Sequence, residues 1–431
     1  MPRVRLALLP VLALLAAAAP ASAQDFGPAI TGPPALGVAA DGQAVLAWSG
    51  SVTTFASLRP AGGAFGPRLK LSTGGNASRT FALGVGRRGD AVVVWQRTDR
   101  RGSPTGSLLA SVHRPGGTFH APIRIPGSTG ARNPSAAVSS DGTTLVAWRL
   151  RGPTGCGYEV RAAIVRPGHP FGPAHRISSA CANAALVRTS MSGDGRGAVV
   201  WRTGRSRESY AIDAAVIGLT RVGAVRRLSY SPMVGLDIEV AGSDTGTIVV
   251  WRDRRGIGPA GATGRVAARN LTASRAGAIV RVSTSDQVVG VARVSVRPNG
   301  AGIIAWEEGI SPSRVMSATR PTTVAPFSAP TVVDTCGATD ASRTYASPAR
   351  DASGGAAVIF QSACMSGYGL GPDYGIALGR RAPEAPWSAA QAVSGAAYGT
   401  WSRIGTADDG ELVLAWVESN AAGLRTAILP G

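Results

Sequence analysis

The most regular pattern in this sequence is a segment that recurs eight times, in which a turn of small residues precedes an apolar run that ends in an aromatic residue. Residues 41–48, 141–148 and 194–201 are clear examples. The closing aromatics are spaced 47 to 56 residues apart and are Trp48, Trp95, Trp148, Trp201, Trp251, Trp306, Phe360 and Trp416. A period of this length predicts repeated supersecondary units that bury their faces against one another.

Each repeat divides into four short apolar segments without helical periodicity. The first precedes a turn that is often Asp-Gly, which favours a tight β-hairpin. The second is the run that ends in the aromatic, and it is apolar on both faces, as expected of a strand buried on both sides. The third ends at Pro-Gly, as in residues 161–168, and the fourth follows an aromatic-Gly-Pro sequence, as in residues 171–177. Each repeat is therefore predicted to form a four-stranded antiparallel sheet.

Repeated four-stranded units of this kind resemble the blades of bacterial secreted β-propeller repeat proteins. The resemblance covers residues 24–431 and concerns the architecture, because no motif of a characterised propeller family is present. It implies an all-β, eight-bladed β-propeller. Residues 25–30 match the fourth-strand pattern of residues 65–70, so the N-terminal strand is predicted to complete the last blade and close the ring. A seven-bladed ring with one additional hairpin is the alternative.

Residues 1–23 have the features of a signal peptide, with Arg3 and Arg5 before an apolar stretch and Ala21-Ser22-Ala23 as a cleavage pattern. Residues 24–431 are then a single propeller domain. Because no later stretch is apolar enough to span a bilayer, we expect a secreted protein, either extracellular or periplasmic. Four cysteines in such a compartment predict two disulfides. Three pairings are possible, of which Cys156–Cys181 and Cys336–Cys364 are the local ones.

The formal net charge is +19, and Lys70 is the only lysine. A basic exported protein favours an anionic glycan, a cell-wall polymer, a membrane surface or a protein as its partner. No nucleic-acid-binding motif is present. The four histidines have no carboxylates at metal-ligand spacing and no nucleophile elbow occurs, so neither a metal nor another cofactor is expected.

The resemblance to propellers predicts two unlike faces. The "loop face" carries the loops between second and third strands and the connections between blades, whereas the "turn face" carries the other turns. The longest loops (residues 97–107, 149–158, 252–265 and 361–374), the four cysteines and the seven tyrosines are all expected on or beside the loop face. Propeller ligand sites usually lie on that face. The turn face is basic as well, because arginine precedes proline at Arg59, Arg114, Arg166 and Arg320.

Charged residues recur at the predicted entry of the innermost strand. Arginines lie thirteen residues before the repeat aromatic in three blades and sixteen or seventeen before it in three others, while blade 5 has two acids. Guanidinium groups bind carboxylate, sulfate or phosphate through paired hydrogen bonds. With neighbouring aromatics, the candidate ligand-binding residues are Arg79, Arg132, Arg188, Arg293, Arg343, Arg403, Asp237, Glu239, Tyr345, Tyr398 and Trp401. Alternatively, Asp237 and Glu239 neutralise these arginines internally.

These residues favour a non-enzymatic binding scaffold that recognises an anionic ligand or glycan through the loop face. One alternative is a carbohydrate-active enzyme, a sialidase-like glycosidase or a lyase. Arginines would then hold a carboxylate, and a tyrosine with Glu239 or Asp237 would supply the nucleophile. The other alternative is a structural or adhesive surface protein whose channel mouth is closed by ion pairs.

Overall fold

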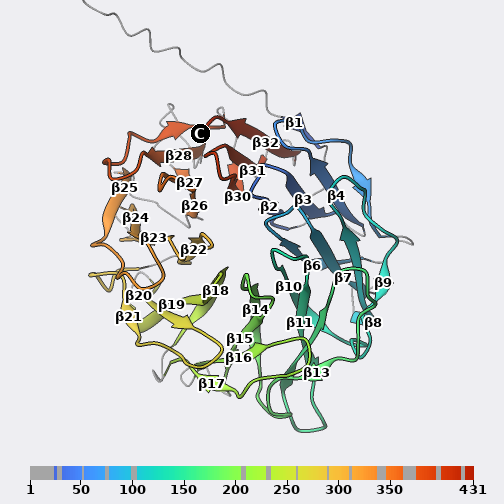
Figure 1. The fold of residues 1–431 in the computed structure, drawn as a ribbon. Helices are drawn as coiled ribbons and strands as arrows, with labels where there is room; N and C mark the ends of the chain where they lie inside the picture. Colours follow the sequence, from blue (N-terminus) through green and yellow to red (C-terminus); the bar gives the residue numbers. More distant parts are fainter. Residues whose placement is uncertain are drawn as a thin grey trace, which may run out of the picture.

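The computed structural model is a closed ring of eight four-stranded antiparallel sheets around a central channel (Figure 1). The structure describes residues 24–26, 32–50, 53–72, 77–98, 104–204, 210–229, 234–258, 261–288, 291–309, 313–336, 346–362, 375–394, 399–418 and 423–431. The predicted signal peptide lies outside these residues. Within them, the chain has no helix whose length and apolar character would suit a membrane span.

Blades 1 to 4 follow one another along the chain, each running from its innermost to its outermost strand. Their strands are β2 (Ala35–Val38), β3 (Ala44–Ser49), β4 (Thr54–Arg59) and β5 (Leu69–Lys70); β6 (Ala77–Val85), β7 (Ala91–Thr98), β8 (Pro104–His113) and β9 (Ile123–Arg124); β10 (Arg132–Val138), β11 (Thr144–Arg151), β12 (Tyr158–Val165) and β13 (His175–Arg176); and β14 (Ala185–Met191), β15 (Gly197–Thr203), β16 (Ala211–Ile217) and β17 (Arg226–Arg227).

Blades 5 to 8 continue in the same order, except that the outermost strand of blade 8 comes from the start of the chain. Their strands are β18 (Val234–Ser243), β19 (Gly246–Gly258), β20 (Gly261–Leu271) and β21 (Val280–Arg281); β22 (Arg293–Val296), β23 (Gly302–Glu308), β24 (Ser313–Arg320) and β25 (Thr331–Cys336); β26 (Ser347–Arg350), β27 (Ala356–Ser362), β28 (Gly375–Arg381) and β29 (Gln391–Ala392); and β30 (Gly399–Thr406), β31 (Leu412–Glu418), β32 (Gly423–Leu429) and β1 (Gln24–Asp25).

The N-terminal strand closes the ring as the sequence predicted. Strand β1 pairs antiparallel with β32, with Gln24 opposite Thr426, and the two strands lie side by side in Figure 1. The backbone N–H of Phe26 extends this pairing by donating to the carbonyl of Leu424 at 3.1 Å. The eight-bladed prediction is therefore confirmed, and the seven-bladed alternative is wrong.

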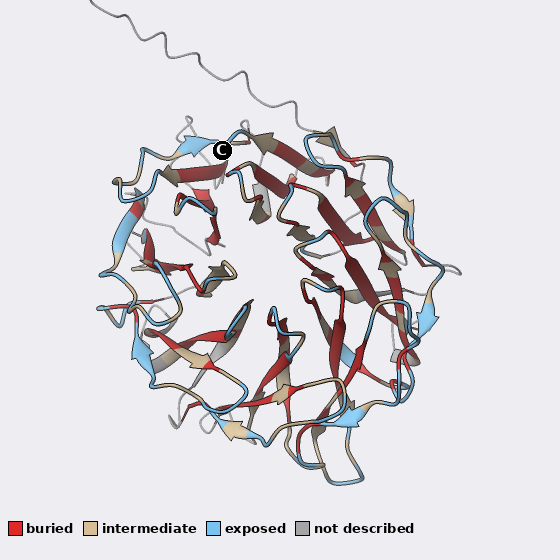
Figure 2. Ribbon diagram, viewed as in Figure 1, coloured by how far each residue is buried: buried red, intermediate tan, exposed pale blue. Residues whose placement is uncertain are grey.

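The repeated aromatics fill the interfaces between blades, each of which we call a seam and name by the two blades it joins. The buried apolar side chains form eight clusters, and each cluster spans one seam and contains one repeated aromatic. Each of these aromatics is no more than 2% exposed. Figure 2 shows the buried colour concentrated on the second and third strands of the blades. The repeat therefore encodes the packing of each blade against its neighbour.

Small residues on the innermost strands allow the blades to approach closely around the channel. A Cβ atom added at Gly37 would lie 2.3 Å from a methyl carbon of Val85, and one added at Gly405 would lie 2.3 Å from a methyl carbon of Val38. The matching position in the other blades also holds glycine, alanine or serine. A larger side chain there would force two neighbouring blades apart.

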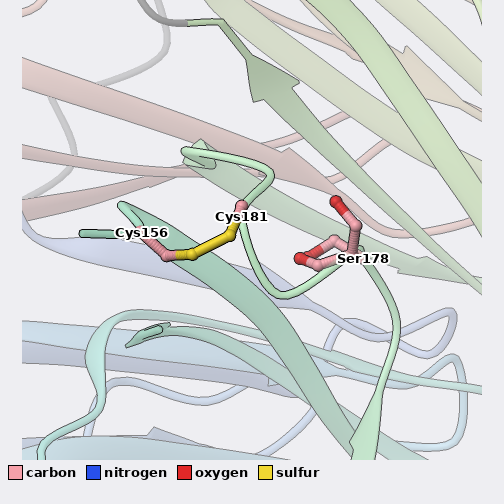
Figure 3. Close-up of a disulfide and its surroundings, with 4 residues drawn as sticks. Cys156, Ser178 and Cys181 are labelled. Carbon is pink, nitrogen blue, oxygen red and sulfur yellow. A yellow bond between two sulfur atoms is a disulfide. The ribbon is translucent and has the colours of Figure 1, made fainter. Parts of the chain in front are cut away.

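A serine after the fourth strand fastens that strand to the third in six blades. In blade 3, the Ser178 hydroxyl accepts a hydrogen bond of 2.8 Å from the backbone N–H of Val160 (Figure 3). The equivalent serines of the other five blades are Ser72, Ser128, Ser229, Ser283 and Ser394. Because fourth strands such as β13 and β17 pair over only two residues, this bond anchors a short outer edge.

The predicted disulfide between Cys156 and Cys181 is present, with the two Cα atoms 4.7 Å apart (Figure 3). It ties the long loop of blade 3 to the connection that leads into blade 4. Closing a loop of this length stabilises a fold by about 3 kcal/mol through the entropy of the unfolded chain. The other predicted pair, Cys336–Cys364, lies outside the described side chains.

Candidate ligand-binding site at the loop face

Four of the predicted site residues occupy one row on the innermost strands. Arg188, Glu239, Arg293 and Arg403, from blades 4, 5, 6 and 8, each pair with the residue that directly precedes the repeated aromatic of the same blade. Arg188 Nε lies 3.9 Å from Glu239 Oε2, which joins blades 4 and 5. The row thus brings three guanidinium groups and one carboxylate to equivalent positions around the channel.

The innermost strands are bulged near their loop-face ends in five blades. Within three of these bulges, Asn133, Leu186 and Trp401 have positive φ values of 49°, 48° and 53°. A bulge changes the direction of the side chains beside it. The Trp401 ring packs, half-buried, against the cluster that contains Phe26 and Trp48. Trp401 is therefore part of the seam where the ring closes.

Two stacked pairs of arginine and tyrosine lie on neighbouring blades at the loop face. In blade 3, the guanidinium carbon of Arg149 lies 4.8 Å from the ring centroid of Tyr158, and that of Arg132 lies 5.9 Å from the same ring. In blade 4, the guanidinium carbon of Arg202 lies 4.1 Å from the centroid of Tyr210. We call these five residues the arginine–tyrosine patch. Stacking on an aromatic face holds a guanidinium group in a defined orientation.

The guanidinium of Arg149 is held by neutral partners. It donates to the Asn133 side-chain oxygen at 2.7 Å and to the carbonyl of Ala184 at 3.3 Å. Burial lowers the pKa of Arg149, and the nearby charges of Arg132 and Arg202 lower it further. Within the described chain, no carboxylate forms an ion pair with Arg132 or Arg149. This part of the patch therefore carries positive charge that no described carboxylate neutralises.

Arg202 is also oriented by a tyrosine ring, but its guanidinium group makes fewer hydrogen bonds than that of Arg149. Its Nε and Nη1 atoms are buried and have no acceptor among the described residues. Burial lowers the pKa of Arg202, although Tyr210 and Asp237 act in the opposite direction. Asp237 forms its ion pair elsewhere, with Asp237 Oδ2 lying 3.7 Å from Nη2 of the nearly buried Arg252. The acids of blade 5 thus pair with Arg188 and Arg252 rather than with the patch.

The remaining predicted site residues cannot be placed. Arg79 belongs to β6, but its side chain is outside the described set, and Arg343, Tyr345 and Tyr398 lie outside the described residues altogether. Two of the seven tyrosines, Tyr158 and Tyr210, are described, and both contact arginines beside the loop face, where the sequence predicted them.

Sequence analysis missed Arg149 and Arg202, although the signal was present. Each directly follows a repeated tryptophan, and a tyrosine follows nine or ten residues after that tryptophan. The residue after the aromatic is polar in seven blades, namely Ser49, Gln96, Arg149, Arg202, Arg252, Glu307 and Gln361. In blade 2, Gln96 donates to the carbonyl of Ala131 in the connection to blade 3, as Arg149 does to Ala184. This position therefore also links consecutive blades.

The channel mouth at the turn face is crossed by an ion triad from three blades that are not neighbours. Asp408 of blade 8 binds Arg87 of blade 2 at 2.8 Å through one oxygen and Arg297 of blade 6 through the other. The innermost strands line a cavity of about 430 Å³, and Arg87 and Arg297 of the triad are among its lining residues. The turn face is less openly basic than the sequence suggested, because Arg59 and Arg320 are only 2% and 3% exposed.

A glycosidase site built on Tyr345 or Tyr398 would lie outside the described residues, and the two described tyrosines do not complete one. Neither Tyr158 nor Tyr210 is hydrogen-bonded to a carboxylate, and Glu239 is paired with Arg188. The described chain also holds no group of three or more histidine, cysteine or acidic side chains arranged for a metal ion. What the loop face offers chemically is oriented positive charge beside aromatic rings.

No family model and no curated protein matches the chain. Solved structures similar to it include an ulvan lyase of polysaccharide lyase family PL25, with 11% identity and a TM-score of 0.49 over 82% of this chain and 93% of that one. Others are the NanB sialidase of Streptococcus pneumoniae (9%, TM-score 0.42, 90% and 83%) and the Aleuria aurantia lectin (10%, TM-score 0.40, 72% and 96%). These likenesses are too distant to assign an activity.

Proposed function

We propose that this protein is an exported, non-enzymatic scaffold that binds an anionic ligand, such as an acidic glycan or cell-wall polymer, through the arginine–tyrosine patch. The observation that carries the proposal is the pair of stacks on neighbouring blades, in which Arg149 and Arg202 are oriented by tyrosine rings and form no ion pair with a carboxylate among the described residues. Neighbouring cations that repel each other are stabilised by a bound anion. The tyrosine rings would add apolar contact area for sugar rings.

Export is part of the proposal. It rests on the signal-peptide pattern of residues 1–23 and is supported by the disulfide between Cys156 and Cys181, because disulfides persist in oxidising compartments. The mature protein would then be the propeller of residues 24–431, outside the cell or in the periplasm. Mass spectrometry of the protein recovered from the producing cells would identify its first residue, for which we expect Gln24.

The binding experiment compares polygalacturonate, dextran sulfate and uncharged dextran at low and moderate salt. We expect the acidic polymers to bind and the uncharged one not to bind, with affinity falling as salt screens the charges. Replacing both patch arginines, Arg149→Gln with Arg202→Gln, removes two charge-assisted contacts and should weaken binding by about 10- to 100-fold.

The matched control is Lys70→Gln with Arg281→Gln, because these residues are exposed on the outermost strands of blades 1 and 5, outside the two blades that carry the patch, and their replacement also removes two charges. Its affinity should stay within about twofold of the unchanged protein. Equal losses in the control and the patch variant would mean that net charge alone drives binding, and the proposed site would be wrong.

A further inference from the structure

Blade 7 carries an arginine at a position where the other blades have apolar or small residues. Arg350 ends strand β26 opposite Ala356, the first residue of β27. The corresponding residues of the other blades are Val38, Val85, Val138, Met191, Gly242, Val296 and Thr406. Arg350 is nonetheless 9% exposed, so a charged group occupies a site that the fold otherwise fills with uncharged side chains.

A second arginine lies on the same row of the blade. Ala356 pairs with Arg350 on one side and with Arg381 of β28 on the other, so both arginines project from the same face of the sheet. They are two strand spacings apart, about 10 Å between Cα atoms, and only the small side chain of Ala356 separates them. Both side chains donate hydrogen bonds to blade 6. Arg350 donates to the carbonyl of Gly302 at 3.3 Å, and Arg381 donates to the hydroxyl of Thr319 at 2.9 Å.

No described carboxylate forms an ion pair with either of these guanidinium groups. The buried Nε of each has no hydrogen-bond acceptor among the described residues. Burial lowers the pKa of both, and the charge of Arg381 lowers the pKa of Arg350 further, whereas Asp351 acts on it in the opposite direction. Asp351 is near, but its Oδ1 atom accepts from Ser353 and from the backbone N–H of Gly355 within its own hairpin. Buried charge without a counterion is costly.

The two arginines line a pocket of about 610 Å³ at the turn face, on the 6/7 seam. A pocket of this size suits a small organic ligand. Besides Arg350 and Arg381, its charged lining consists of Arg87, Arg297, Asp351, Glu384 and Asp408. Asp408 binds both Arg87 and Arg297, and the four arginines and three acids together leave the lining of the pocket with one net positive charge.

We propose that the 6/7 pocket binds a small molecule that carries a single carboxylate group, with the carboxylate oxygens accepting hydrogen bonds from Arg350 and Arg381. This site is on the opposite face from the arginine–tyrosine patch and does not depend on it. A carboxylate matches the excess of one charge, and its two oxygens suit the planar fork of a guanidinium group.

The test measures the melting temperature and the binding heat of the intact protein with acetate, lactate and D-glucuronate. D-glucose is the uncharged control, and inorganic phosphate tests for a preference for a dianion. We expect at least one carboxylate to bind and raise the melting temperature, and glucose to do neither. Arg350→Val installs the residue found in four other blades, so this variant should fold, and its affinity for the carboxylate should fall by about 10-fold or more.

Ala301→Glu is the second variant, because it supplies a carboxylate from blade 6 to the same arginines. It should abolish carboxylate binding while raising the melting temperature of the ligand-free protein. Undiminished binding in Arg350→Val, a response to phosphate only, or no response to any carboxylate would overturn the proposal. The patch variant Arg149→Gln with Arg202→Gln should bind the carboxylate normally, so failure of this site and failure of the proposed function can be told apart.

Discussion

The 8/1 and 6/7 seams differ in what surrounds the arginine that lies on the third strand, opposite the first residue of the second strand. In blade 1, this arginine is Arg59, whose Nη1 and Nη2 bind the two oxygens of Glu411 in blade 8 at 2.7 and 2.8 Å. In blade 7, the equivalent arginine is Arg381, which donates to the hydroxyl of Thr319 in blade 6 and stacks on the ring of Trp387 in its own blade. The position of Glu411 is occupied in blade 6 by Ala301, which lines the pocket.

The difference shows how one residue of the preceding blade decides what a buried arginine does. With a carboxylate opposite, Arg59 fastens the seam where the two ends of the chain meet. With alanine opposite, Arg381 borders an open pocket. Arg320 of blade 6 is intermediate, because it binds the neutral amide oxygen of Asn270 in blade 5 at 2.9 Å and burial lowers its pKa to about 10. A repeat can thus acquire a pocket by the loss of a single acidic side chain.

The largest expected effect comes from breaking the ion pair of the 8/1 seam. Glu411→Ala leaves Arg59, whose side chain is 1% exposed, without its counterion and should reduce the free energy of unfolding by about 3–5 kcal/mol. Urea unfolding followed by tryptophan fluorescence measures this loss. The double replacement Arg59→Met with Glu411→Leu should recover most of it, and a double variant as unstable as Glu411→Ala would show that the buried charge is not the cause.

The next effect separates the apolar contribution to the same seam from the ionic one. Phe26 is 8% exposed and packs edge-on against Trp48, with ring centroids 5.4 Å apart. Phe26→Ala removes this contact and should cost about 3 kcal/mol in urea unfolding. Val333→Ala in the fourth strand of blade 6 is the comparison at the 6/7 seam and should cost about 1–2 kcal/mol. A smaller loss for Phe26→Ala than for Val333→Ala would mean that the apolar contact of Phe26 contributes little to the stability of the 8/1 seam.

The smallest effect concerns blade 2, which has His113 at the same position. His113 is buried, one ring nitrogen contacts the carbonyl of Gly89 at 3.1 Å, and burial lowers the pKa of His113 below 6.5. Between that lowered pKa and 6.5, the unfolded chain binds the proton more readily, so acidification through this window should reduce stability. His113→Leu, which copies the residue of blades 5 and 8, should lose less stability between pH 7.5 and 5.5. Parallel pH profiles for the two proteins would contradict the assignment.

The ring and its seams could be predicted from the sequence because they repeat. Eight aromatics at a near-constant spacing predicted eight seams, and the match between residues 25–30 and 65–70 predicted that the N-terminal strand completes blade 8. Both inferences depend on local patterns of apolar residues, which packing between blades enforces in each repeat.

The contacts of single charged residues could not be predicted in the same way. Arg59 and Glu411 are far apart in the sequence and meet only because the ring closes. The triad of Arg87, Arg297 and Asp408 joins three blades that are not neighbours in the ring. Arg350 went unnoticed although the signal was present, because it lies ten residues before Phe360, at the spacing where blades 1 to 3 have a valine before their tryptophans. The sequence directed attention to the loop face, whereas the 6/7 pocket lies at the turn face.

Closure by β1 has a consequence for the order of folding. Gln24 and its partner Thr426 are about 400 residues apart, so the last blade cannot be completed until the final hairpin has formed. Until β1 pairs with it, β32 is an open edge at the end of the last blade, and this edge can add a strand from another copy of the chain. A neighbouring molecule's β1 could complete that edge as well as the chain's own, which makes strand exchange the characteristic misfolding hazard of this ring at high concentration.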